Sequence, residues 1–350
     1  MARRPDNPRP GLVVIDKPQG LTSHDVVSRV RRLAHTRKVG HGGTLDPMAT
    51  GVLVIGIGKA TKLLTWVSGH SKEYRATIRF GVATNTDDAE GVATAALGCA
   101  SLSEEELESA LAPLRGDIMQ VPSTVSAIKV NGKRAYALAR AGEDVELAAR
   151  PVRISRLQVL APPRPAEYVC DEADGENVPD AELPSGPVSV VDVDVVVECS
   201  SGTYVRALAR DAGEALGVGA HLTALRRTRV GDVTVESAVT LDELSAAVEA
   251  ATPEGEPEAE PILPLVPLGE AARTMFPTLL LTEAEAGAFA HGQAPRHSRG
   301  ELAQWATEVG YRPDGSSEEE ASPIAALAPD GTVLGLLRID EARLRTVLVF

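Results

Sequence analysis

Apolar and polar residues follow two different rhythms along this chain, and each rhythm predicts a different kind of element. Apolar or alternating runs that end in turn residues are typical of strands, and they occur at 11–16, 51–57, 72–84, 152–162 and 188–200. Apolar residues spaced three or four apart predict helices at 23–35, 103–116 and 202–218. Thr22 or Ser23 is expected to cap the first of these helices. The pattern predicts a large domain that mixes strands and helices.

Shifts in composition divide the 350 residues into several segments. We expect a flexible basic tail at 1–10, a large mixed domain at 11–248, a linker rich in Pro and Glu at 249–269, and a small β-rich domain at 270–350. An Asp-Gly turn at 330–331 predicts a hairpin in the small domain. The acidic stretch at about 163–187 looks like an insertion between two strands.

The net charge of −14 argues against a nucleic-acid partner, but its distribution changes the picture. Residues 1–80 hold 14 Lys and Arg against 5 Asp and Glu, and five arginines lie between Thr203 and Gly231. The acidic residues gather instead in runs that read as solvated loops or linkers. A basic face would suit a phosphate backbone, whereas the same residues on helix faces would only solubilise them. Charge alone leaves these two readings open.

Other classes of protein are disfavoured by what the sequence lacks. No apolar run has the length of a membrane span or of a secretion signal. The three cysteines and seven histidines show no spacing of metal ligands. We therefore expect a cytoplasmic protein with free thiols, no metal and no cofactor.

The stretch GHGGTLDPMATGVL at 40–53 holds a single carboxylate, Asp46, among glycines and directly before Pro47. Taken alone, Asp46 reads either as an Asx turn or helix cap, or as a functional group in a constrained loop. The loop lacks the GxxxxGK[ST] pattern of a triphosphate site.

Five motifs in one order are more informative. The segments KPQGLTS, HGGTLDPMATGVL, KEYR, CSSGTYVRALARDAG and LRRTRVG together resemble the TruB family of bacterial tRNA pseudouridine synthases, from about Gly11 to Val248. The small domain resembles, less specifically, the PUA-like domain of these enzymes. The resemblance implies an α+β fold with a mixed or antiparallel-sheet catalytic domain, and isomerisation of the uridine at position 55 in the tRNA T loop. Such an isomerisation needs no metal, redox carrier or activated cosubstrate.

The resemblance also assigns roles to residues. Asp46 takes the place of the catalytic nucleophile, Arg206 that of the arginine paired with it, and Tyr74 that of a tyrosine that stacks on the base and acts late as a general base. Leu225 matches an apolar residue that packs on the base. Whether Asp46 attacks the base or the sugar, or acts through a glycal, stays open.

Three further residues are expected at the substrate pocket with less specific support: Tyr204, His41 and Lys17. The last of these, with Pro18, is also expected to form a turn that buttresses the catalytic loop.

A uridine stacked in a folded T loop must be flipped out before a buried carboxylate can reach it. Basic side chains are expected to contact the tRNA phosphates, namely Arg29, Arg31, Arg32, Arg37, Lys38, Arg226, Arg227 and Arg229. The acidic insertion should then lie away from the tRNA. We expect a monomer without a required protein partner and without membrane attachment. Two alternatives are an RNA-binding or tRNA-folding chaperone and a guide-RNA-dependent synthase similar to dyskerin.

Overall fold

The computed structural model describes residues 9–123, 129–130, 133–134, 147–170, 183–184, 186–251, 261–311, 323–340 and 343–350. Most of the expected basic tail and most of the acidic insertion lie outside the described residues. Within the described residues, no helix is long and apolar enough to cross a membrane.

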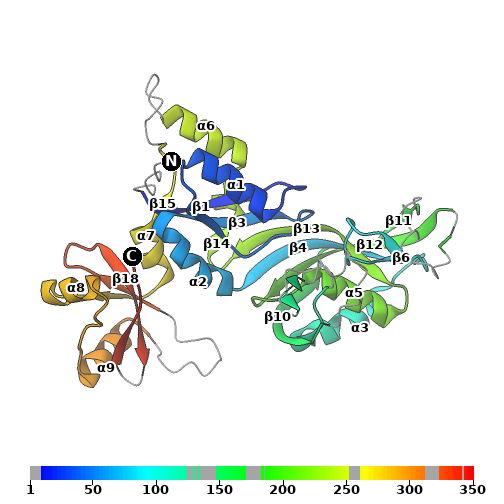
Figure 1. The fold of residues 1–350 in the computed structure, drawn as a ribbon. Coiled ribbons are helices and arrows are strands. Elements are labelled where there is room, and N and C mark those ends of the chain that lie inside the picture. Colours follow the sequence, from blue (N-terminus) through cyan, green and yellow to red (C-terminus); the bar gives the residue numbers. More distant parts are fainter. Residues whose placement is uncertain are drawn as a thin grey trace.

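One mixed sheet forms the body of the molecule (Figure 1). Its strands are β1 (Gly11–Lys17), β2 (Val39–Gly42), β3 (Thr50–Ile57), β4 (Lys72–Phe80), β7 (Gly116–Gln120), β10 (Arg150–Val159), β11 (Arg164–Tyr168), β12 (Val188–Cys199), β13 (Ala220–Val230), β14 (Val233–Thr234) and β15 (Val266–Pro267). They follow the order β15-β1-β3-β13-β4-β12-β10-β7, with β2 beside β3, β14 beside β13 and β11 beside β12. The pairs are antiparallel except β3 with β13, which run parallel. This mixed sheet confirms the predicted α+β class. Two short pairs lie outside it, β5 (Ala83–Thr84) with β6 (Ala93–Ala95) and β8 (Lys129–Val130) with β9 (Lys133–Arg134).

The apolar run of β3 is continuous because both faces of the sheet are covered at this strand. Leu53 and Ile55 point into a core that also contains Val26 and Val30 of the first helix. Val52 and Val54 point the other way. Successive side chains alternate between the two faces of a strand. A strand that packs against an apolar core on each face is therefore apolar along its whole length.

Helices cover the two faces of this sheet. They are α1 (Ser23–Leu33), η1 (Gly58–Leu63), α2 (Leu64–Gly69), α3 (Glu104–Leu111), η2 (Ala112–Leu114), α5 (Val205–Leu216), η3 (Val235–Ser237) and α6 (Leu241–Ala251). Thr22 caps α1 through a capping box with Asp25, which decides between the two expected caps. Ser103 and Glu106 cap α3 in the same way. Helix α5 ends at Gly217, whose left-handed φ of 71° suits glycine.

A second sheet forms the small C-terminal unit. Its strands are β16 (Thr278–Leu280), β17 (Ile324–Leu327), β18 (Val333–Asp340) and β19 (Arg343–Val349), and the helices around it are α7 (Leu268–Met275), α8 (Glu283–Ala290) and α9 (Arg299–Glu308). The hairpin expected at the Asp-Gly turn is present, because β17 pairs antiparallel with β18. Both ends of the expected linker belong to regular elements, since α6 runs to Ala251 and β15 pairs with β1.

The small sheet is covered on both faces. Ile324 and Ala326 of β17 face the unit's own core, which includes Phe289 of α8. Ala325, between them, faces a second core, which also contains Val52, Val54 and other side chains of the large sheet and its helices. The two units therefore share one hydrophobic cluster, and in Figure 1 the small unit lies beside α2 and α7.

Candidate active site

Asp46 lies in the loop between β2 and β3, and neighbouring segments hold this loop on both sides. The buried Ser23 hydroxyl donates to the Leu45 carbonyl at 2.9 Å and accepts from the Leu45 amide at 2.8 Å. The Lys17 ammonium donates to the Pro47 carbonyl at 3.2 Å. The residues directly before and after Asp46 are thus fixed by the start of α1 and the end of β1, and this explains the constrained loop.

Arg227 holds the earlier part of the same loop. Its guanidinium donates to the carbonyls of Gly43 at 3.0 Å and Thr44 at 3.3 Å, and through Nε to Val52 at 2.8 Å. The side chain has no solvent exposure. The expectation that Arg227 contacts tRNA phosphates is therefore wrong, because its donors are engaged inside the protein.

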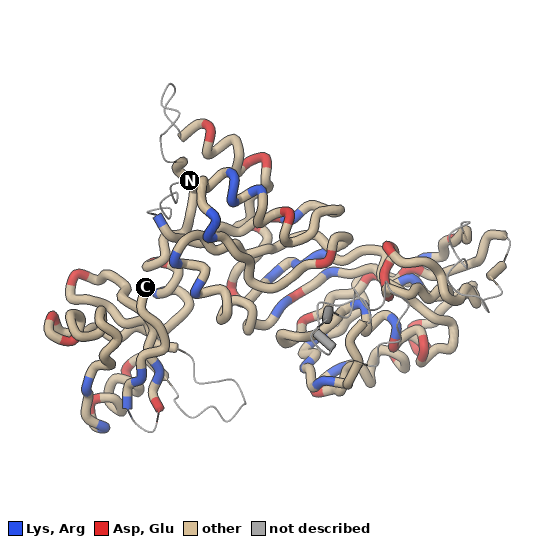
Figure 2. The backbone as a smooth tube through the Cα atoms, viewed as in Figure 1, with Lys and Arg blue, Asp and Glu red and all other residues tan. Residues whose placement is uncertain are grey.

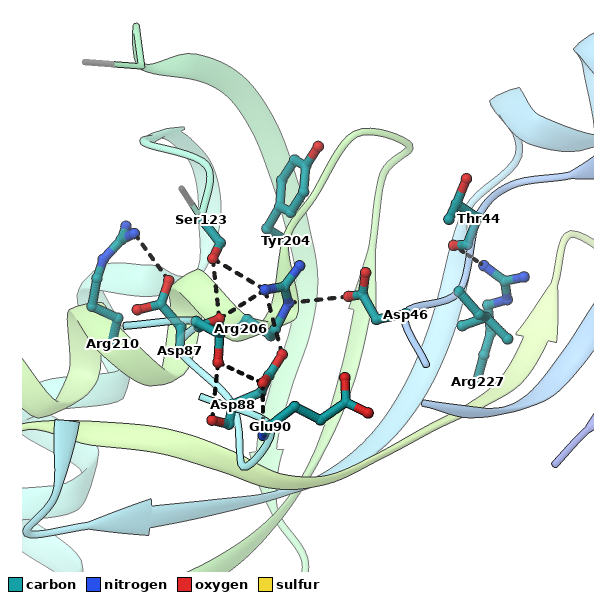
Figure 3. A network of polar contacts seen from close by, with 12 residues as sticks. Thr44, Asp46, Asp87, Asp88, Glu90, Ser123, Tyr204, Arg206, Arg210 and Arg227 are labelled. Carbon is teal, nitrogen blue, oxygen red and sulfur yellow. Dashed lines mark hydrogen bonds and ion pairs between the residues drawn. The ribbon is translucent and has the colours of Figure 1, made fainter. Parts of the chain in front are cut away.

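The carboxylate of Asp46 faces the guanidinium of Arg206 (Figure 3). Nε of Arg206 lies 3.0 Å from Oδ2 of Asp46, and the two side chains are 3% and 36% exposed. The arginine is thus enclosed while the carboxylate stays partly open. An oriented carboxylate with one free side is what nucleophilic or base chemistry requires.

Arg206 is fixed by further acceptors on its other side. Nη1 lies 3.4 Å from Oδ2 of the buried Asp88 and donates to the Thr86 carbonyl at 2.7 Å and to Ser123 Oγ at 3.2 Å. Figure 3 shows Asp88 and Ser123 beside the guanidinium, on the side away from Asp46. Asp88 itself accepts from the Thr86 hydroxyl at 2.7 Å. A buried cation with this many partners has one well-defined position.

Asp87 and Glu90 flank Asp88. Burial raises the pKa of the Asp87 carboxyl, which lies 3.4 Å from Arg210 Nη1. Burial and the nearby charges of Asp88 and Asp46 raise the pKa of Glu90. Acidic groups therefore gather beside Arg206, and Glu90 lies close enough to Asp46 for their charges to interact.

The first turn of α5 places Arg206, and Gln120 of β7 fixes that turn. The Gln120 amide accepts from the Tyr204 backbone N–H at 2.9 Å and donates to the Tyr204 carbonyl at 3.1 Å. The N-cap residue Tyr204 makes no side-chain cap hydrogen bond, and the buried Gln120 instead holds both polar groups of its backbone.

A cavity of about 260 Å³ opens in front of the ion pair. Its walls come from the loop between β2 and β3 that carries Asp46, from β4 and β13, and from the segment 201–206. Five of the expected site residues line it, namely Asp46, Tyr74, Tyr204, Arg206 and Leu225. Pockets that enclose drug-sized ligands measure roughly 300–1,000 Å³, so this smaller space suits a single base.

Tyr74 and Lys72 lie two residues apart on β4 and form one wall of the cavity. Burial raises the pKa of the Tyr74 phenol, and a hydrogen bond from Arg227 acts in the opposite direction. Burial lowers the pKa of Lys72 to about 8. The Lys72 ammonium donates to the carbonyls of Ser68 at 2.8 Å and His70 at 2.7 Å.

Two expected pocket residues lie outside the cavity lining. Lys17 is fully buried, and besides Pro47 its ammonium donates to the carbonyls of Pro18 at 2.9 Å and Leu21 at 2.6 Å. Its position favours the buttressing role over contact with a substrate. His41 lies on β2 with its ring 6.3 Å from that of His24, and burial lowers its pKa.

Sequence reasoning did not single out Asp88, Ser123, Gln120 or Lys72. The stretch TNTDDAEG around Asp88 is so rich in turn residues that it predicted only a connection. For Lys72 a signal was available, since residues two apart in a strand share a face, and Tyr74 was already a candidate.

The basic residues expected to contact RNA have different surroundings. Arg29, Arg32 and Arg37 are exposed, and Figure 2 shows several basic positions along the backbone of α1. Arg29 and Arg32 border a groove that also contains Asp242 of α6. Arg226 forms an ion pair with Asp16 at 2.7 Å, and Arg229 forms one with Glu198 at 2.7 Å.

Comparison with known proteins agrees with the motifs. Residues 31–205 match the family model "TruB family pseudouridylate synthase (N terminal domain)", and residues 206–267 match "tRNA pseudouridylate synthase B C-terminal domain". The chain is 48% identical over 340 residues to a protein of an Arthrobacter species named tRNA pseudouridine synthase B, covering 97% of this chain and 96% of that one. It is 60% identical over 237 residues to a Mycobacteroides abscessus protein of the same name, covering 68% of this chain and 72% of that one.

Solved structures show the same fold. The crystal structure of a Cbf5-Nop10-Gar1 complex contains a chain that matches with a TM-score of 0.61 at 22% identity, over 97% of this chain and 84% of that one. An H/ACA RNP bound to a substrate RNA containing 2'-deoxyuridine gives a TM-score of 0.60 at 22% identity, with the same coverage. The sequence matches over nearly the whole length decide the assignment: this chain belongs to the TruB family of pseudouridylate synthases.

Proposed function

We propose that this enzyme isomerises uridine to pseudouridine in tRNA, at position 55 of the T loop, with Asp46 as the catalytic nucleophile. Membership of the family supports uridine isomerisation, and the names of the relatives support tRNA as the substrate. Position 55 rests on the motif resemblance.

One observation supports Asp46 as the catalytic nucleophile. Among the described residues that line the cavity, it alone bears a carboxylate, and Arg206 orients that carboxylate at 3.0 Å. The reaction breaks one glycosidic bond and forms a carbon–carbon bond between the same base and sugar. A single oriented carboxylate beside a base-sized space supplies the group that such a reaction needs.

The remaining walls support base binding. Leu225 and Tyr204 offer an apolar and an aromatic surface to a flipped-out uracil. Removing a base from its stack costs roughly a few kcal/mol, which contacts of this kind offset.

Tyr74 is proposed to stack on the base and to accept a proton late in the reaction. Because burial raises the pKa of its phenol, the side chain is protonated in the free enzyme near neutral pH. It accepts a proton only after its own has been released, and the hydrogen bond from Arg227 favours that release.

We propose further that the enzyme works as a monomer without a guide RNA or protein partner. Chains of the same fold occur in complexes named Cbf5-Nop10-Gar1 and H/ACA RNP, so this part needs its own test.

The test compares the wild-type enzyme with Asp46→Asn on an unmodified tRNA transcript, using purified protein alone. Pseudouridine at the T-loop uridine and tRNA affinity are measured in parallel. The proposal expects modification by the wild type, no modification by the variant, and equal binding by both. Asp117→Asn is the matched control, because Asp117 is an exposed, arginine-paired aspartate that does not line the cavity.

Turnover by Asp46→Asn would overturn the role of Asp46. A wild-type enzyme that binds tRNA but makes no pseudouridine would favour the RNA-folding function. Activity that appears only with a guide RNA or partner would refute independent action.

A further inference from the structure

Two buried cations, Lys72 and Arg227, lie side by side along one wall of the cavity. A Cβ added to Gly43 would lie 3.6 Å from both Lys72 Cε and Arg227 Nη1, so the two side chains flank the same glycine. Lys72 comes from β4 and Arg227 from the neighbouring β13. Asp46 and Arg206 line the same cavity.

These two cations lack a matching negative charge. Their described acceptors are backbone carbonyls and the Tyr74 phenol, and among the described residues no carboxylate forms an ion pair with either. Cys199 packs behind them on β12, and burial raises the pKa of its thiol to about 11, which leaves the thiol neutral. Two like charges without a counter-ion are unfavourable in a buried place, and an anion in the cavity would relieve the cost.

The proposed reaction produces such an anion whichever route Asp46 takes. If the carboxylate attacks C1′, a C1′–O bond forms, the C1′–N1 bond breaks, and its electron pair leaves on the base. If the carboxylate takes the C2′ proton, the C2′–H electrons form a C1′=C2′ bond, and the N1 electron pair again leaves with uracil. If the carboxylate adds to C6, the C5=C6 electrons move toward O4 as an enolate. Each route places one negative charge on the uracil ring.

We propose that Lys72, with Arg227 fixed behind it, stabilises the anionic uracil that forms in this cavity. This inference rests on the proposed function, because it needs uridine as the substrate. The Lys72 ammonium has three N–H groups, and two are directed to the carbonyls of Ser68 and His70. The third serves a carbonyl oxygen of the uracil. A charge held in place before the reaction stabilises the transition state without reorganisation, and this is the usual source of large rate effects.

The experiment measures single-turnover rates on unmodified tRNA for wild type, Lys72→Met and Lys72→Arg. Lys59→Met is the control, since Lys59 is exposed on η1. Methionine keeps the length of the side chain and removes the charge. We expect Lys72→Met to lower the rate by about 10- to 100-fold, with tRNA affinity changed less than about twofold, whereas Lys59→Met has no effect.

Two readouts separate an electrostatic role from a structural one. The wild-type rate should fall above about pH 8 as Lys72 loses its proton, and Lys72→Arg, which stays charged, should lack this fall. The groups that face Lys72 are Arg227, Tyr74 and Cys199, and they are unchanged in this variant. A tRNA with 5-fluorouridine at the target gives the second readout, because the fluorine stabilises the base anion. The difference between wild type and Lys72→Met in the rate of glycosidic bond cleavage should therefore be smaller with 5-fluorouridine than with uridine.

Equal rates for Lys72→Met and wild type would overturn the inference. So would an alkaline fall that persists unchanged in Lys72→Arg, or a deficit that is the same for uridine and 5-fluorouridine. If Lys72→Met does not fold, as judged by circular dichroism, the Lys72→Arg pH profile decides alone. A wild-type enzyme without activity would refute the proposed function instead, so the two failures are distinct.

Discussion

Nε of Arg206 lies 3.0 Å from Oδ2 of Asp46, and this contact joins the first turn of α5 to the loop between β2 and β3, which is distant in the sequence. The arginine is almost fully enclosed, whereas the carboxylate is partly open to the cavity. The position of the carboxylate therefore depends on everything that fixes the arginine.

Replacing Arg206 by lysine should abolish most of the activity. One ammonium cannot serve Asp46, Asp88 and the Thr86 carbonyl together, because it lacks the planar fork of the guanidinium. We expect the single-turnover rate to fall by about 100- to 1,000-fold, as when a preorganised electrostatic partner is removed, with tRNA binding retained. A rate within about threefold of wild type would refute the dependence on the guanidinium geometry.

Asp88→Asn tests the acceptor on the far side of Arg206. The amide keeps the shape and weakens the charge-assisted contact to Nη1 at 3.4 Å, so the guanidinium loses one of its restraints. We expect a smaller loss, on the order of tenfold, measured in the same single-turnover assay. Asp117→Asn again provides the control, and equal effects of the two variants would contradict a specific role for Asp88.

Tyr74→Phe separates stacking from proton transfer. Phenylalanine fills the same buried space on β4 and retains the stacking surface, so the fold and tRNA affinity should persist. Product formation should fall sharply, because the phenol oxygen is lost. Quantifying tRNA binding, consumption of the target uridine and pseudouridine separately checks this, and wild-type product formation by Tyr74→Phe would rule out the proton-transfer role.

Lys17 should make stability depend on pH. Burial lowers its pKa from the ordinary value of 10.5 to about 8, so between these pH values the unfolded chain binds more protons than the folded one. Stability contributed by Lys17 is thus present at high pH and is lost as the pH falls toward 8.

The free energy of unfolding of wild type, relative to Lys17→Met, should therefore rise with pH between 8 and 10. The slope is at most about 1.4 kcal/mol per pH unit. Urea unfolding at several pH values measures it, with Lys59→Met as reference. A difference that stays constant, or falls, would contradict the burial of the ammonium.

Gly51→Ala should be strongly destabilising. Gly51 has a φ of +99°, and an added Cβ would lie 2.1 Å from the carbonyl oxygen of Arg227, where β3 and β13 pair. Gly20→Ala is the control, because its φ of +84° is equally left-handed but no atom lies within 4 Å of the added Cβ. We expect about 1 kcal/mol for Gly20→Ala and several kcal/mol for Gly51→Ala in urea unfolding. Similar losses would show that β3 and β13 separate more easily than the structure indicates.

The elements that sequence could predict are those with local causes. The continuous apolar run around Ile55 and the capping residues Thr22 and Asp25 act within a few residues, so β3 and α1 follow from the pattern. The pairing of Asp46 with Arg206 came from motif resemblance, because nothing local connects the two residues.

The features that the sequence could not predict depend on hydrogen bonds to the backbone of distant segments. An arginine next to other arginines suggests a surface, yet Arg227 is buried because three backbone oxygens converge on it. Its distance of two residues from Leu225 in β13 was the available signal, since both then share a face of the strand. Gln120 had no such signal, because its partner Tyr204 belongs to a distant segment.

The shared hydrophobic cluster has a consequence for how this protein can change. A module attached by a linker can be exchanged, lost or duplicated without harm to its neighbour, but Ala325 and Leu336 of the small unit belong to the same buried cluster as Val52 and Val54 of β3, and α7 contacts both β1 and β18. Separation would expose apolar surface on both sides. The two units should therefore evolve as one body, because a substitution in this cluster alters the packing of both.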